Sequence, residues 1–185
     1  MAHGGDVIAE LTTDHREVDL LFDQIDAAPP GRVERKKLLD ALIVELVRHS
    51  VAEELHLYPA VREHLEEGDA LADKELADHA RVEQLLKDLE GRDASDENFE
   101  RLVRELRTEV TAHVQDEEDH LFAQLRDGVH PYVLERLGGK VRDAKKTAPT
   151  RPLPGTPSTP PANKLLAPGV GLVDRARDYV TGRRQ

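Results

Sequence analysis

A polar pattern on the apolar face of a predicted helix constrains the fold of this chain more than any other feature. The segment HSVAEELHLYP, residues 49–59, places His49, Glu53 and His56 at positions i, i+4 and i+7, which share one face of a helix. That face continues the apolar positions Leu42 and Leu46. Burying an unpaired polar group among apolar residues costs roughly 2–7 kcal/mol. Something must therefore compensate for the burial of these side chains.

The pattern occurs twice. Sixty-four residues later, the segment HVQDEEDHLFA places His113, Glu117 and His120 at the same spacing. The same offset relates the segment DHREVDLLFD to DHARVEQLLK, and so pairs His15 with His79. The chain is therefore an internal repeat of two helices. Each of the four segments has a histidine followed four residues later by an acid, and these acids are Asp19, Glu53, Glu83 and Glu117.

Four long amphipathic helices are predicted from the spacing of the apolar residues. Their ranges are about 6–27, 32–67, 70–90 and 96–127. Gly68 is the expected stop of the second helix, and Ser95 is the expected cap of the fourth. Pro59 lies inside the second helix and is expected to kink or break it. Short connections favour an all-α fold, namely an up-down-up-down antiparallel four-helix bundle.

The sequence after the fourth helix divides into a fifth helix and a tail. A short fifth helix is predicted from Pro131 to the glycine pair at 138–139, so that the bundle domain covers residues 1–146. The stretch TAPTRPLPGTPSTPPA is rich in proline and poor in apolar residues, and a disordered linker is predicted over residues 147–163. An apolar stripe with basic flanks over residues 164–185 predicts an amphipathic C-terminal segment that orders only on docking.

Charge is distributed unevenly along the chain. Residues 1–140 contain 17 Lys+Arg against 34 Asp+Glu, whereas residues 141–185 contain 9 against 3. An acidic bundle repels phosphate groups, which argues against nucleic acid as the main partner, and it attracts cations. The basic tail is expected to contact the acidic bundle, an anionic membrane surface or another partner.

The sequence contains no cysteine, which excludes disulfides and thiolate metal sites. No apolar run approaches the ~18 residues of a membrane span, and the N-terminus lacks the basic and apolar stretches of a signal peptide. A soluble cytoplasmic protein is therefore expected.

The histidines are expected to converge on the axis of the bundle. Each of the four lies near the middle of its helix, and two glutamates lie one turn further along their helices. Such a set contains nitrogen and oxygen donors alone, which suits divalent iron, manganese or zinc. Because a carboxylate can bridge two metals, two bridging glutamates with two histidines per ion is the natural arrangement. The candidate ligands are His15, His49, Glu53, His79, His113 and Glu117.

Four further polar residues near this layer are open candidates. Asp19 and Glu83 are expected to be solvated acids at the edge of the bundle, because their neighbours in sequence hold the core positions. His56 and His120 share the ligand face, but they lie about 10 Å along the helix axis from His49 and His113. An outer-shell or entrance role is expected for them ahead of ligation.

The remaining acids and aromatic residues of the repeats are expected to have structural roles. Asp14 and Asp78 are expected to be acids on the helix surface, because adjacent helix positions point about 100° apart. Tyr58, Phe122 and Phe22 are expected in the core. The other histidines, which are expected to be exposed, are His3, His64 and His130.

The order of these residues resembles that of the hemerythrin-like HHE cation-binding domain family. The resemblance rests on the order of the six candidate ligands, together with an EExxLYP-type run at 53–59 and its echo EEDHLFA at 117–123, and it covers residues 5–127. It implies a four-helix bundle that holds a non-haem di-iron centre, with those six side chains as ligands. Two iron ions are therefore expected, ahead of zinc or manganese.

One departure from the family changes the expected chemistry. Oxygen-carrying hemerythrins have a second histidine four residues after the third-helix histidine, and this chain has Glu83 there. A more anionic site favours ferric iron, so reactions with dioxygen, peroxide or nitric oxide are expected ahead of reversible oxygen carriage. Enzymatic activity stays open. The alternative is an iron- or redox-responsive regulatory module that signals through its C-terminal tail. A bundle without metal is disfavoured by its buried histidines.

Overall fold

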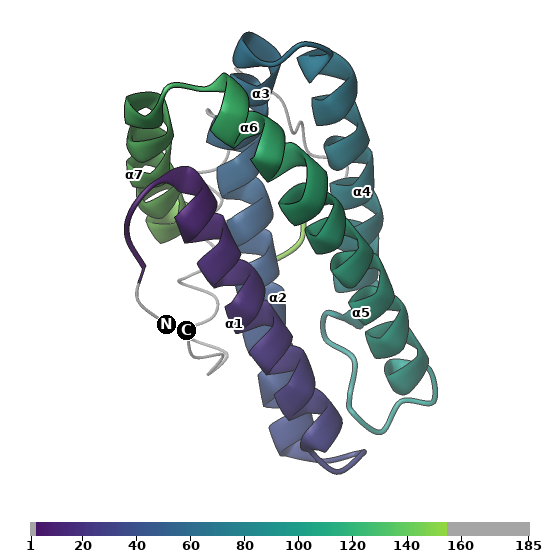
Figure 1. The fold of residues 1–185 in the computed structure, drawn as a ribbon. Helices are drawn as coiled ribbons and strands as arrows, with labels where there is room; N and C mark the ends of the chain where they lie inside the picture. The colour runs from purple at the N-terminus through teal and green to yellow at the C-terminus, as the bar shows by residue number, and fades with distance from the viewer. Residues whose placement is uncertain (1–2, 155–185) are drawn as a thin grey trace.

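The computed structural model describes residues 3–154, which form helices and contain no strand. The chain runs up and down through four long rods, each a single helix or several helices joined end to end, and one further helix packs outside them (Figure 1). The predicted all-α fold is therefore confirmed. The elements are α1 (Val7–Ala27), α2 (Val33–Ala52), η1 (Glu53–Leu57), α3 (Tyr58–His64), α4 (Gly68–Leu89), α5 (Phe99–Asp116), η2 (Glu117–Leu121), α6 (Phe122–Gly128) and α7 (Pro131–Thr147).

Two of the rods contain a turn of π-helix, labelled η1 and η2, directly after the histidine–glutamate pair. In these turns the Glu53 carbonyl accepts a hydrogen bond from the Tyr58 N–H, and the Glu117 carbonyl accepts one from the Phe122 N–H. Pro59 therefore does not end its rod, which continues as α3. The second repeat has alanine at the equivalent position, so proline is not the cause of the wider turn. Such turns are frequent at functional sites.

Two helix boundaries differ from the sequence prediction. Gly68 begins α4 instead of ending the preceding helix, and a Cβ atom at that position would lie 2.2 Å from the Val61 carbonyl oxygen. Ser95 does not cap α5, which begins at Phe99. Its backbone N–H and its hydroxyl both donate to the Asp93 carboxylate, at 2.9 and 2.6 Å. This local turn competes with the helix for Ser95.

The fifth helix, α7, is longer than predicted because it continues through the glycine pair to Thr147. A Cβ atom at Gly138 would lie 2.6 Å from the Gly5 carbonyl oxygen, so glycine allows α7 to approach the start of α1. After α7 the chain contacts α4, where the Leu153 N–H donates to Glu83 Oε1 at 2.9 Å. Residues 155–185, which include most of the predicted linker and the predicted amphipathic segment, lie outside the described residues.

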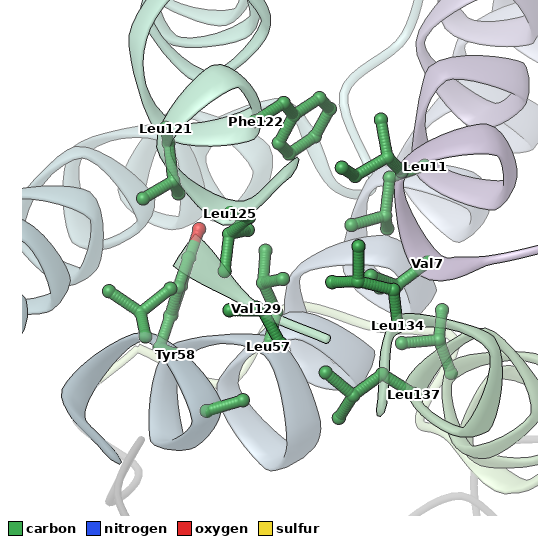
Figure 2. Packing of buried hydrophobic residues seen from close by; sticks show 14 of the residues in the cluster. Val7, Leu11, Leu57, Tyr58, Leu121, Phe122, Leu125, Val129, Leu134 and Leu137 are labelled. Carbon is green, nitrogen blue, oxygen red and sulfur yellow. The ribbon is translucent and has the colours of Figure 1, made fainter. Parts of the chain in front are cut away.

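Buried apolar side chains form two groups, with a layer of buried polar residues between them. On α1, Leu11 belongs to the first group and Val18 to the second, and His15 lies between them. The first group joins α1, α3, α6 and α7, and includes Tyr58 and Phe122 (Figure 2). Within the described residues, no helix is both long and apolar enough to cross a membrane.

Candidate metal centre

The polar layer brings together all six side chains that the sequence singled out. Each of the long rods contributes one histidine, and the two π-turns contribute the two glutamates. The glutamate side chains are 0% exposed, and the four histidines are 2–7% exposed. The members are His15, His49, Glu53, His79, His113 and Glu117.

Each glutamate lies between histidines from different halves of the bundle. Glu53 Oε2 is 3.0 Å from His49 Nε2 and 3.3 Å from His79 Nε2. Glu117 Oε2 is 3.4 Å from His15 Nε2 and 3.7 Å from His113 Nε2. The imidazole rings themselves form two pairs, with centroids 5.0 Å apart for the first two helices and 4.9 Å apart for the last two. Each carboxylate therefore spans both histidine pairs, as a bridging ligand would.

Several inward-facing atoms of this layer have no hydrogen-bond partner among the described residues. They are both carboxylate oxygens of Glu53, Oε2 of Glu117 and Nε2 of His15. Two overlapping groups, one of His15, His49 and both glutamates, the other of Glu53, His79 and His113, each place their donor atoms within 4.8 Å of one another. Buried polar atoms without partners are costly. The donor set and its unsatisfied atoms fit a bound metal cation.

The outer nitrogen of every histidine faces a carboxylate, and the two repeats use equivalent acids. His15 Nδ1 is 2.8 Å from Glu118, and His79 Nδ1 is 3.0 Å from Glu54. A carboxylate at this position fixes the tautomer and the orientation of a metal-binding imidazole, and raises its basicity. Both acids lie in the repeated runs at 53–59 and 117–123, but no role was predicted for either from the sequence.

The prediction that Asp14 and Asp78 are surface acids is wrong for Asp14. Asp14 is buried, and its Oδ2 is 3.2 Å from His49 Nδ1 on the neighbouring helix. Asp78 Oδ2 lies 3.9 Å from His113 Nδ1, and the buried carboxylate of Glu75 lies closer, at 3.0 Å. The 100° offset between adjacent positions turns these acids away from the histidine that follows them and toward the histidine of the next helix.

The electrostatics of the layer favour imidazolium–carboxylate pairs when no metal is bound. Burial lowers the pKa of His49, but Glu53 and Asp14 outweigh burial and raise that pKa to about 10. The pKa of His79 is likewise raised to about 10 against burial by Glu53 and Glu54. Burial raises the pKa of Glu53, but the same two histidines outweigh it and hold that pKa well below its usual range. Metal ligands must be deprotonated, so metal binding here would release protons.

Tyr58 breaks the symmetry between the repeats. Its hydroxyl is 2.9 Å from His79 Nε2 and donates to Glu117 Oε1 at 3.2 Å. Burial and the nearby Glu117 raise the pKa of this phenol well above its usual value. The equivalent residue, Phe122, stacks on the His15 ring with centroids 5.8 Å apart. Both are core residues as predicted. The polar contact of Tyr58 was not predicted, although the exchange of tyrosine for phenylalanine between the repeats is a signal of it in the sequence.

None of the four open candidates belongs to the groups of converging donor atoms found among the described residues. Asp19 is exposed and is 3.6 Å from Arg16, while Glu83 accepts the hydrogen bond from Leu153. His120 is 68% exposed and contacts Asp116 at 3.1 Å. His56 lines a groove between α3 and α7. The outer-shell or entrance role expected of these two histidines stays a prediction.

A small cavity of about 20 Å³ touches all four histidines of the layer. Its other walls are mainly apolar, and are formed by Val18, Leu46, Ser50, Val82, Val110 and Val114. A cavity needs about 10–15 Å³ to hold one water molecule. The space therefore fits a ligand of one or two heavy atoms.

The comparisons with known proteins agree with this geometry. The family profile described as Hemerythrin HHE cation binding domain matches residues 6–125. An uncharacterised hemerythrin-like protein of Schizosaccharomyces pombe is 27% identical over 90% of this chain and 82% of its own length. The crystal structure of a hemerythrin HHE cation-binding domain-containing protein from Mycobacterium kansasii superposes with a TM-score of 0.67 at 26% identity, covering 76% of this chain and 85% of that one.

One further relative is much longer. A protein of Nostoc sp. named DNA nickase is 30% identical over 137 residues, which are 73% of this chain and 38% of that protein. The shared region is therefore only part of the nickase.

Proposed function

The chain belongs to the family of hemerythrin HHE cation-binding domains, and we propose that it is a non-haem di-iron protein that binds or reacts with dioxygen, peroxide or nitric oxide. One observation carries the proposal: six buried side chains direct nitrogen and oxygen atoms inward, in overlapping groups whose donor atoms lie within 4.8 Å of one another, and several of these atoms lack a hydrogen-bond partner among the described residues. The proposed ligands are His15, His49, Glu53, His79, His113 and Glu117. Each ion would take one pair of histidines, and the two glutamates would bridge the ions.

The choice of iron rests on the donor set and on the family. Imidazole nitrogen and carboxylate oxygen suit iron, manganese and zinc, and no thiolate is available to select a softer metal. Iron would supply redox chemistry and open coordination positions for a small ligand. Zinc or manganese is the less favoured occupant.

The residues of the chain prepare the site for that chemistry. Outer carboxylates such as Asp14 and Glu118 accept the Nδ1 proton of their histidines, so that the Nε2 lone pairs face inward. The walls of the adjoining cavity are mainly apolar, and its volume of about 20 Å³ suits a ligand of one or two heavy atoms, such as a diatomic molecule or peroxide. The Tyr58 hydroxyl is placed to donate a hydrogen bond beside His79.

We propose oxidation chemistry or peroxide or nitric oxide detoxification ahead of reversible oxygen carriage. The support is Glu83, which stands where the oxygen carriers have a histidine and which accepts the hydrogen bond from the Leu153 N–H. A ligand set without that fifth histidine would leave a further coordination position open, which favours reaction with a small ligand over its reversible carriage.

The second candidate is a regulatory module that reports iron or redox state through its C-terminal tail. The observation that favours it is the path from the metal layer to the tail: α7 contacts α1 through Lys145 and Asp14, and residues 151–153 contact α4. Deleting residues 155–185 distinguishes the candidates. A self-contained di-iron protein keeps its metal and its reactivity, whereas a signalling module keeps its metal and loses its output.

We also propose that the chain acts in the cytoplasm and without nucleic acid as its partner. Residues 1–140 carry 34 acidic against 17 basic side chains, which would repel phosphate. The nickase relative shares only 38% of its length with this chain. The shared part is proposed to be the metal-binding bundle and not the nicking activity, while the basic tail is left as the surface for a partner.

Metal analysis and an optical spectrum of the aerobically purified full chain test the proposal. Two irons per chain, with near-ultraviolet bands of a ferric carboxylate or oxo-bridged site, are the expected result. Zinc at full occupancy, or no metal after anaerobic loading with ferrous ion, would overturn it.

A further inference from the structure

The helix α7 lies outside the region that the family profile matches, which ends at residue 125, yet it reaches the metal layer. Lys145 Nζ donates to Asp14 Oδ1, and the other oxygen of Asp14 is 3.2 Å from His49 Nδ1. One turn earlier on α7, Arg142 donates to Glu10 Oε2 at 3.1 Å. Two cations of α7 therefore hold two buried acids of α1.

The internal repeat explains why a cation from α7 is needed. In the second repeat Lys74 is 3.0 Å from Asp78 and 3.1 Å from Glu75, so one helix carries both the acids that face His113 and the cation that holds them. The residue equivalent to Lys74 in the first repeat is Glu10, an acid. The first repeat therefore lacks a cation of its own at this position, and Lys145 of α7 contacts Asp14 instead.

Burial makes the contact with Lys145 specific. The Asp14 side chain is 6% exposed and that of Lys145 is 14% exposed, so water screens their interaction little. A buried carboxylate that loses a permanently charged partner becomes costly. Two further groups face Asp14: His3, whose Nδ1 is 3.7 Å from Oδ1, and His49. Of these groups only Lys145 carries a permanent charge.

We propose that Lys145 is a positioning residue of the metal centre, which holds the Asp14 carboxylate against the outer nitrogen of His49 and so joins α7 to the site. This inference rests on the proposed function, because it takes His49 as a metal ligand. Without Lys145, Asp14 is free to turn from His49, and the orientation of the imidazole is less well fixed. A looser contact between Asp14 and Nδ1 makes His49 a weaker donor, so ferric iron is stabilised less.

The test compares Lys145→Ala, Lys145→Arg and Lys146→Ala in the full chain. Lys146 is the matched control, since it is adjacent, 72% exposed and paired with Asp143. Lys145→Ala is expected to weaken iron affinity about tenfold, as removal of groups that orient metal ligands does, and to raise the reduction potential of the site. Lys145→Arg restores both values, and Lys146→Ala matches the wild type. Lys145→Gln, which keeps a hydrogen-bond donor, replaces Lys145→Ala if that variant does not fold.

The outcomes separate this inference from the proposed function. If Lys145→Ala lowers only the melting temperature, with affinity and potential unchanged, Lys145 is merely structural and the inference is overturned. If the wild-type chain takes up no iron, the proposed function is overturned, and nuclear magnetic resonance of the histidine rings in the metal-free protein then decides about Lys145. The contact predicts that the Nδ1 signal of His49 shifts in Lys145→Ala and not in Lys146→Ala. An unmoved signal overturns the inference.

Discussion

The raised pKa values of the buried histidines predict that the metal-free protein loses stability as pH rises. His49 titrates near 6.5 in the unfolded chain and at about 10 in the folded chain. A group whose pKa is raised on folding contributes stability that is fully present below pH 6.5 and is lost as pH rises through 10. Between pH 6.5 and 8.5 this one histidine removes roughly 2 kcal/mol from the free energy of unfolding. His79, with the same pKa, adds a loss in the same direction.

Denaturant unfolding of the chelator-treated protein at pH 6.5, 7.5 and 8.5 measures this loss. Total stabilities of small domains are about 5–15 kcal/mol, so the change is large enough to move the midpoint clearly. Glu53→Gln removes the anion shared by His49 and His79, and should flatten the dependence. His120→Gln, at an exposed histidine, should leave it unchanged. Stability that stays constant or rises with pH in the metal-free wild type would refute the reasoning.

Three further predictions follow from single contacts. Asp14→Asn should lower iron affinity about tenfold by weakening the contact to His49. Asp19→Asn, at an exposed position, should leave the affinity unchanged. If a competitive chelator titration gave both variants the same iron affinity, this prediction would be wrong. Tyr58→Phe should keep the iron content and change the optical spectrum, because the hydroxyl contacts His79; an identical spectrum would show that the hydroxyl does not reach the bound metal. Glu83→Ala should speed proteolysis after Arg151 without changing the iron content, since it removes the acceptor of the Leu153 N–H; loss of iron would instead place Glu83 at the site.

The inner part of the site could be predicted because the spacing of residues within each single helix indicates its members. A histidine in an apolar seam is visible from spacing alone, and the repeat of that spacing identified every member of the layer, such as His15 on α1 and His113 on α5. The outer part was not predictable in this way. Asp14 on α1 contacts His49 on α2. The spacing of residues within one helix does not show which residues of a neighbouring helix lie close to it.

Backbone features account for the other differences. The spacing of apolar residues does not distinguish an α-turn from the π-turn at Glu53–Leu57, which adds one residue to the hydrogen-bonded ring. Glycine normally signals the end of a helix, but at Gly138 its missing Cβ permits close packing on α1 and the helix continues. The length of α7, and with it the position of Lys145, could not be obtained from the local sequence.

The two repeats have diverged at positions that face the site, and this makes the two histidine pairs chemically different. Beside His79 and His113 lie the Tyr58 hydroxyl and the Glu75 carboxylate, at 2.9 and 3.0 Å. The equivalent residues of the other half are Phe122 and Leu11, which are apolar. A symmetric ancestor would hold two equivalent ions, whereas this chain places two additional hydrogen-bonding groups beside one pair of histidines and apolar residues at the equivalent positions of the other repeat. Under the proposed function, a small ligand between the pairs would meet the Tyr58 hydroxyl as a hydrogen-bond donor on one side, an arrangement that would favour its reaction over its storage.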